Sequence, residues 1–343
     1  MFELGHPKHY HMFKRLMDNY RSNGNQIIVM ARNKDVLLNL LKADKIKYVR
    51  FGPHLDGLLK KLLITPLLLF NYFAILVFYR PKIVFSKASP YVSFFSRALR
   101  LNHIIFPDSD GFKSNDVLGK HASLIITPDN YKDDYGPKHK RINGFFENLY
   151  LHPEVFKPNK QLLSKYGIDP LSKYIIIRLV GWGAHHDTFA KGISKEKLTN
   201  LIKGLEKHAR VYLSSEGAQS KELNKYKLDI DPADIHHVLY FASAYLGDSQ
   251  TMATEASLLG VPSIRTNSFV GDKDMTNFKL LEQKHGLLYN FSDPQKAFKK
   301  AATLLQEPGT KDKWQEKRQR YYKENRDVFK QILSYINDFE SKT

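Results

Sequence analysis

The sequence predicts an α/β protein with two Rossmann-like domains, and three observations support this prediction. Its 343 residues are too many for one ordinary core and suit two domains of about 170 residues each. Short apolar runs alternate with amphipathic helical segments in both halves, which is typical of parallel sheets. The stretch from Gly247 to Arg265 has the pattern of a strand end, a tight turn, a helix and the next strand, as in a βαβ unit.

The first half begins with a short strand from Phe2 to Leu4 and then alternates helix and strand. Further strands are predicted at 26–30, 47–51, 83–85, 103–106 and 123–127, and helices around 12–20, at 36–41 and from Ser89 onward. The segment 129–140 is polar and has no periodicity, so it is predicted to be a loop. The connection between the domains is placed at 144–158, where two prolines interrupt the chain.

The second half repeats the same alternation. Strands are predicted at 174–178, 210–213, 244–246, 261–264 and 286–289, and helices at 198–205, 235–241, 250–259, 279–284 and 294–305. A closing helix is predicted from Lys311. The chain therefore divides into an N-terminal domain at 1–150, a second domain at 151–310 and a C-terminal helical segment at 311–343.

The turn at 247–251 is the main candidate for a binding site. A turn of this kind presents free backbone N–H groups at the positive end of a helix, outside the carboxyl end of a parallel strand, where an anion is expected. Glu255 follows in the second helical turn, where its carboxylate can accept hydrogen bonds from both hydroxyls of a ribose. A solvated surface carboxylate fits this position equally, so both interpretations stay open. The residues assigned to the anion site are Gly247, Asp248, Ser249, Gln250 and Thr251.

Other candidates follow the first two strands of the second half. Arg178 can pair with a diphosphate bidentately, and Gly181 lets the backbone approach a ligand. His186 and Asp187 form a candidate acid–base pair, although adjacent side chains often point apart. The residues expected to reach a nucleotide base are Ser215 and Glu216.

Three histidines, His6, His9 and His11, follow Gly5 at the start of the first helix. Their spacing does not favour zinc, because no Cys and no obvious carboxylate stand nearby, and we predict neither a metal nor a cofactor. The remaining interpretations are acid–base chemistry and a structural hydrogen bond at the helix start.

Polar residues also end other strands of the first half, at the sheet edge where ligands bind. Arg32 follows the second strand, and Ser89 can cap the helix after the fourth. Asp108 and Asp110 follow the fifth strand and are candidates for acceptor binding or proton transfer. Both are equally typical of turn residues.

Composition limits the classes of partner. Fifty-three Lys and Arg against 35 Asp and Glu give a formal net charge of +18, which favours anionic ligands. No nucleic-acid-binding motif is present, so nucleic acid is not predicted. The chain has no Cys, and its start lacks the pattern of a signal peptide, so a cytoplasmic protein is expected.

The most apolar segment runs from Leu58 to Tyr79. The part from Leu62 to Phe78, which Pro66 and Asn71 interrupt, is only about the minimum span of a bilayer. A crossing here would also separate the first three strands from the rest of their sheet, so a spanning helix is not favoured. A buried crossover helix and a helix lying on the membrane surface both remain open. Flanking Lys60, Lys61, Arg80 and Lys82 would suit anionic headgroups in the second case.

The pattern DS-x-T-x-x-x-E-A-x-x-L-G-x-P at 248–262 resembles the donor-nucleotide segment of GT-B enzymes, especially UDP-N-acetylglucosamine 2-epimerases and related glycosyltransferases. The whole chain resembles an uncharacterised GT-B-like family of polysaccharide gene clusters, known as a domain of unknown function. The segments that carry this likeness are GHPKHYHMFK at 5–14, ARNKDVLLNLL at 31–41, GFFENLYLHPEVFKP at 144–158 and AHHD at 184–187.

The resemblance implies a GT-B type fold whose two parallel sheets face a central cleft, with a closing helix that crosses back to the first domain. It implies a nucleotide-diphospho-sugar in the second domain and an acceptor, glycan or lipid-linked, in the first. His9 or His11 would be the general base, and Glu147 would lie near the cleft. The expected reaction is glycosyl transfer in surface-polysaccharide synthesis; the alternatives are a 2-epimerase and a non-catalytic nucleotide-sugar-binding protein.

Overall fold

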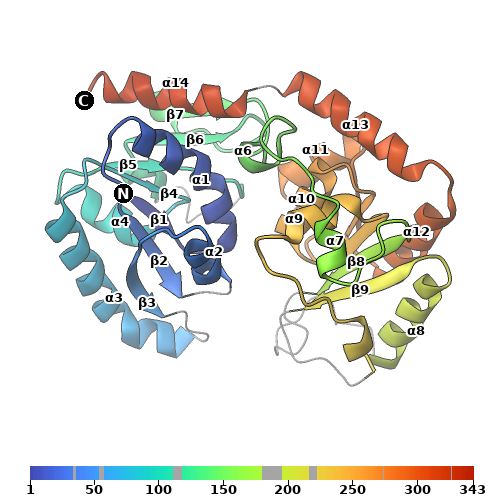
Figure 1. Ribbon diagram of the computed structural model, residues 1–343. Coiled ribbons are helices and arrows are strands. Elements are labelled where there is room, and N and C mark those ends of the chain that lie inside the picture. The colour runs from blue at the N-terminus through green and yellow to red at the C-terminus, as the bar shows by residue number, and fades with distance from the viewer. Residues whose placement is uncertain are drawn as a thin grey trace. The chain divides into compact units, whose positions relative to one another are not determined.

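The computed structural model describes residues 1–33, 36–53, 58–110, 118–179, 195–215, 222–272, 274–325 and 327–343. The chain forms two compact units (Figure 1). Unit 1 contains Met1–Tyr150 and Asn325–Thr343, and unit 2 contains Leu151–Glu324. Each unit is built on its own parallel sheet, which confirms the predicted α/β class.

Unit 1 has a seven-stranded sheet in the order β3-β2-β1-β4-β5-β6-β7. The strands are β1 (Phe2–Leu4), β2 (Val29–Asn33), β3 (Val49–Pro53), β4 (Ile83–Ser86), β5 (Asn102–Ile105), β6 (Leu124–Pro128) and β7 (His139–Ile142). All of their pairings are parallel. The strand order reverses between β1 and β4, and the crevice at such a switch point is where ligands of open α/β sheets bind.

Helices cover both faces of this sheet. Its helices are α1 (Pro7–Ser22), α2 (Leu37–Ala43), α3 (Leu58–Tyr79), α4 (Pro90–Ser96), a short α6 (Asn148–Leu151) and α14 (Val328–Glu340), with a 3-10 turn η1 (Gly136–Lys138). One core joins Phe2 and Leu4 to α1, α2 and α14, and a second joins Met1 to α3 and α4. Because successive side chains of a strand point to opposite faces, Glu3 faces the α3 and α4 side.

Unit 2 has a five-stranded sheet in the order β12-β11-β10-β8-β9. Its strands are β8 (Tyr174–Leu179), β9 (Arg210–Ser215), β10 (Ala244–Gly247), β11 (Ser263–Thr266) and β12 (Leu288–Phe291), all paired in parallel. The order reverses between β8 and β10. Its helices are α7 (Leu162–Lys165), α8 (Lys195–Glu206), α9 (Ile235–Phe241), α10 (Gln250–Leu258), α11 (Thr276–Gln283), α12 (Pro294–Gln306) and α13 (Thr310–Glu324), with a 3-10 turn η2 (Asn224–Tyr226).

Three details differ from the sequence prediction. The segment predicted as one closing helix is two helices, with α13 in unit 2 and α14 in unit 1, because Asp327 takes a left-handed backbone (φ 56°) that no α-helix accommodates. Part of the predicted loop at 129–140 is edge strand β7, which pairs through its backbone although its side chains are polar. Strands β2, β3, β11 and β12 each begin and end later along the chain than predicted.

Helix α3 is a single helix that packs one face on unit 1, through Leu68, Tyr72 and Leu76. Within the ranges that the structure describes, no helix is long and apolar enough to cross a bilayer.

Candidate functional site

The turn after β10 has the predicted geometry. Strand β10 ends at Gly247, and Ser249 caps α10 by accepting a hydrogen bond from the Met252 N–H at 3.3 Å. The first intrahelical bond runs from the Ala253 N–H to the Ser249 carbonyl at 3.0 Å. The N–H groups of Gln250 and Thr251 precede that bond, so helix geometry leaves them for an outside acceptor.

Gly247 is required by a close approach between two strands. A Cβ atom at this position would lie 2.6 Å from the carbonyl oxygen of Arg178 and 2.6 Å from the hydroxyl oxygen of Tyr245. Tyr245 is fully buried, and its hydroxyl lies 3.4 Å from the Ser249 carbonyl oxygen. The glycine therefore lets β8 and the turn lie against each other.

Arg178 lies at the same edge of the sheet as the turn. It pairs in register with Gly247 of β10 and Ser214 of β9. Its Nη1 donates to Ser214 Oγ at 2.7 Å, and its carbonyl accepts from the Asp248 N–H at 3.2 Å. The sheet thus brings a half-buried guanidinium to the turn that precedes α10.

Glu255 is not the solvated carboxylate that one interpretation allowed. It is only 7 % exposed, and its Oε1 lies 3.1 Å from Nε2 of His236, a buried residue of α9. Sequence analysis did not single out His236. Its only signal was a polar pair, His236 and His237, in an otherwise apolar helix. Ribose recognition by Glu255 stays a prediction.

Of the other predicted residues of unit 2, the structure describes only Ser215. Ser215 ends β9 and pairs with Leu179 of β8. The residues that lie outside the described ranges are Gly181, His186, Asp187 and Glu216.

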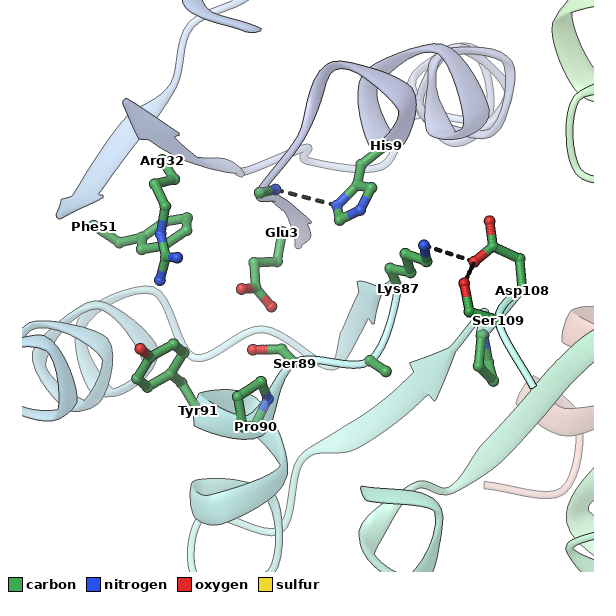
Figure 2. A pocket seen from close by; sticks show the side chains of 13 residues that line it. Glu3, His9, Arg32, Phe51, Lys87, Ser89, Pro90, Tyr91, Asp108 and Ser109 are labelled. Atoms are coloured by element: carbon green, nitrogen blue, oxygen red, sulfur yellow. Dashed lines mark hydrogen bonds and ion pairs between the residues drawn. The ribbon is translucent and has the colours of Figure 1, made fainter. Parts of the chain in front are cut away.

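Unit 1 contains a pocket of about 510 Å³ at the carboxyl ends of its central strands (Figure 2). It lies at the reversal between β1 and β4, where the topology predicts a ligand. Its lining consists of Glu3 and Gly5 of the β1 segment, His9 of α1, Arg32 of β2, Phe51 of β3, Lys87–Tyr91 from the end of β4 into the start of α4, and Pro107–Ser109 after β5. The structure therefore brings together Gly5, His9, Arg32, Ser89 and Asp108 of the predicted residues.

Ion pairs hold one wall of the pocket. Lys8 Nζ lies 2.5 Å from Asp108 Oδ2 and 2.6 Å from Glu147 Oε1. Lys87 Nζ lies 2.6 Å from Asp108 Oδ1, as Figure 2 shows. Burial alone would raise the pKa of Asp108, but the two lysine charges hold it well below its usual value of 3.8. Asp108 is therefore a structural anion and a weak base. Its predicted companion Asp110 is buried and does not line the pocket.

His9 lines the pocket, and its hydrogen bond disfavours the base role predicted for it. Its Nδ1 accepts the backbone N–H of Gly5 at 3.2 Å, so the proton of the neutral ring is on Nε2 (Figure 2). Burial, together with the positive charge of Lys87, holds the pKa of His9 well below 6.5. A general base needs an unprotonated ring nitrogen facing its substrate, and this arrangement supplies an N–H instead.

The other two histidines make contacts within unit 1. His6 is the N-cap of α1, and its Nδ1 accepts from the Lys8 N–H at 3.1 Å. The His11 ring stacks on Tyr150 with centroids 5.3 Å apart, and His11 does not line the pocket. A base role for His11 stays a prediction.

The residues that sequence analysis did not assign to the site include four of the polar and aromatic lining residues, Glu3, Lys87, Phe51 and Tyr91. Glu3 had a signal, a charged residue inside an apolar strand, and Lys87 follows a strand end as Arg32 does. Phe51 and Tyr91 had none, because aromatic residues at those positions look like ordinary core.

Known structures support the fold. The chain is similar to the spinosyn forosaminyltransferase SpnP (13% identity, 98% of this chain, 99% of that chain, TM-score 0.62). It is also similar to MnaA of S. aureus with UDP (14% identity, 99% of this chain, 96% of that chain, TM-score 0.67). A third similar structure is UDP-GlcNAc 2-epimerase from Neisseria meningitidis bound to UDP-GlcNAc (12% identity, 98% of this chain, 99% of that chain, TM-score 0.64). These likenesses establish the GT-B type fold that the sequence predicted.

No curated protein matches the chain. A sequence profile of one family, described as protein of unknown function (DUF354), matches residues 2–315. The match covers nearly the whole chain, as the sequence resemblance led us to expect. The protein belongs to the DUF354 family.

Proposed function

We propose that the protein is a glycosyltransferase that uses a nucleotide-diphospho-sugar donor, in the synthesis of a surface polysaccharide or related glycan. The observation that carries this proposal is the edge of the unit 2 sheet, where Arg178 lies beside the turn that leads into α10. A guanidinium and free N–H groups at a helix start are suited to a diphosphate.

Unit 2 would bind the donor. The N–H groups of Gln250 and Thr251 would hold one phosphate, and Arg178 would pair with the other. As the glycosidic bond breaks, the diphosphate gains negative charge, and these fixed donors stabilise it. Glu255 would then accept hydrogen bonds from the ribose hydroxyls, in exchange for its contact with His236.

The pocket of unit 1 would bind the acceptor. The Nε2–H of His9 faces it and would donate to an acceptor oxygen. Asp108, held by two lysines, would keep that wall of the pocket in place. In this proposal His9 has a donor role in place of the base role predicted from the sequence, and the proton of the attacking hydroxyl would pass to water.

A 2-epimerase of a UDP-N-acetylglucosamine type sugar is the second candidate, because the similar structure from Neisseria meningitidis is such an enzyme. That reaction needs carboxylates to remove and return a proton. Two of the predicted carboxylates, Asp108 and Glu147, are instead engaged by lysines. This favours the transferase.

Incubation with UDP-N-acetylglucosamine alone separates the two candidates. The transferase should leave the configuration at C2 of the sugar unchanged. It should hydrolyse UDP-N-acetylglucosamine slowly at most, because no acceptor is present. NMR of the sugar anomeric protons follows the reaction. Accumulation of the C2 epimer would establish the epimerase and contradict the transferase.

We also propose that unit 1 docks on the anionic inner face of the plasma membrane. The outer face of α3 exposes Leu67 (56 %), Phe70 (67 %) and Phe78 (78 %). Phe94 of the adjacent α4 is 67 % exposed. The chain from 58 to 101 contains seven Lys or Arg and no Asp or Glu, which complements anionic headgroups.

Replacing Phe70 and Phe78 together by glutamine should weaken binding to vesicles on the order of a hundredfold, because each buried phenylalanine contributes about 1.5–3 kcal/mol. Cosedimentation with vesicles of phosphatidylglycerol and phosphatidylcholine measures this. Leu171→Gln in unit 2, where Leu171 is 89 % exposed, is the matched control and should bind as the wild type does. Equal binding by all three proteins would exclude this face as the docking site.

A further inference from the structure

We infer that the ligand of the unit 1 pocket carries an anionic group, a phosphate or a carboxylate, which Arg32 binds. This deepens the proposed function, on which it rests, by naming the chemical class of the acceptor. The inference comes from the charges and the hydrogen-bonding groups that line the pocket.

Arg32 places a guanidinium at the wall of the pocket. Its guanidinium carbon lies 5.3 Å from the ring centroid of Phe51 and 5.9 Å from that of Tyr91, and Figure 2 shows it reaching from β2 toward Tyr91. Its Nε is buried and has no hydrogen-bond partner. In the part of the chain that the structure describes, Arg32 forms no ion pair. Two aromatic rings therefore position a guanidinium whose donors remain available.

The nearest carboxyl group does not neutralise this charge. Glu3 interacts with Arg32 electrostatically but forms no ion pair with it. Its Oε1 instead accepts from Tyr72 at 2.5 Å, and its Oε2 is buried without a partner. Burial is the largest influence on Glu3 and raises its pKa, which favours the neutral carboxylic acid. Glu3 therefore competes less strongly for Arg32 than an ordinary carboxylate would.

The other polar groups of the pocket also donate. His9 presents its Nε2–H, as its bond to Gly5 requires. Lys87 Nζ lies on the same side and has donors beyond the one it gives Asp108 (Figure 2). Donors from β2, α1 and the end of β4 thus line one pocket, and an oxyanion is the group that accepts from such donors. A neutral sugar hydroxyl would leave the charge of Arg32 unmatched.

The test compares three sugars that differ in one group: glucose, glucose 6-phosphate and glucuronate. Isothermal titration should show both anions binding at least about tenfold more tightly than glucose. In Arg32→Met that preference should disappear, whereas Arg178→Met in unit 2 should keep it. Dihexanoyl phosphatidate, added as monomers, shows whether a lipid phosphate enters the same pocket; competition with glucose 6-phosphate indicates a lipid-linked acceptor.

Equal affinity for glucose and its anionic forms, or an unchanged preference in Arg32→Met, would overturn the inference. If Arg32→Met does not fold, the Arg32 Nε–H signal of the wild type, assigned with Arg32→Lys, gives a second readout. It should shift with glucose 6-phosphate and stay in place with glucose, and no shift with either contradicts the inference. No nucleotide is used, so failure of nucleotide binding in unit 2 would refute the proposed function and leave this result intact.

Discussion

Replacing Arg178 by methionine should raise the Kd for UDP by about ten- to a hundredfold. Hydrogen bonds to a charged group contribute about 1.5–3 kcal/mol, and every 1.4 kcal/mol is a factor of ten in affinity. Methionine keeps much of the hydrocarbon volume, so the half-buried site should still fold. Isothermal titration measures the affinity, and thermal unfolding in the absence of ligand checks the fold.

Arg210→Met is the matched control for that experiment. Arg210 begins the neighbouring strand β9, at the opposite, amino edge of the sheet, and is exposed. It removes the same charge from the same unit, so it should change UDP affinity by less than about twofold. A similar loss in both variants would mean that general charge, rather than the site beside α10, attracts the nucleotide.

Replacing Asp108 by asparagine should destabilise unit 1 by about 3–5 kcal/mol, the usual cost of leaving buried charges without their partner. Asp108 balances both Lys8 and Lys87, and its side chain is only 12 % exposed. Urea unfolding measures the loss. Adding Lys87→Met should recover a large part of it, because Lys8 and Glu147 then remain as a balanced pair. Failure of the second change to restore stability would show that the lysine charges are not the cause.

The same carboxylate should give stability a pH dependence. Its pKa in the folded protein is well below 3.8, so the unfolded chain takes up the proton first as the pH falls. The contribution of Asp108 is therefore complete above about pH 5 and is lost as the pH decreases through 3.8 toward the lower folded pKa. The Asp108→Asn protein should lose less stability than the wild type over this range. Parallel curves would contradict the assignment.

The local pattern of the sequence predicted most strands and helices because each element is buried on one side or both. Edge strand β7 was not predicted, because its pairing uses only the backbone and its side chains show no apolar pattern. Which side of α3 packs on unit 1 could not be predicted, because the helix is apolar all round and its sequence shows no period. The division between α13 and α14 depends on the backbone of Asp327, which no apolar spacing reveals.

The candidate site divides in a similar way. The turn at Gly247 could be predicted because a glycine, a cap and a helix follow one another along the chain. The partners of Lys8, of Glu255 and of the His9 ring could not, because they depend on contacts between segments far apart in sequence. For the same reason the sequence could not show that His9 would donate a hydrogen bond, as we propose, because the Gly5 N–H determines which ring nitrogen carries the proton.

The proposal that unit 2 binds a nucleotide diphosphate is tested most directly by a crystal structure of the protein with UDP. We expect one phosphate within hydrogen-bond distance of the Gln250 and Thr251 N–H groups, the other against Arg178, and the ribose hydroxyls on Glu255. A diphosphate bound elsewhere on the protein, with Glu255 still paired to His236, would contradict the proposal.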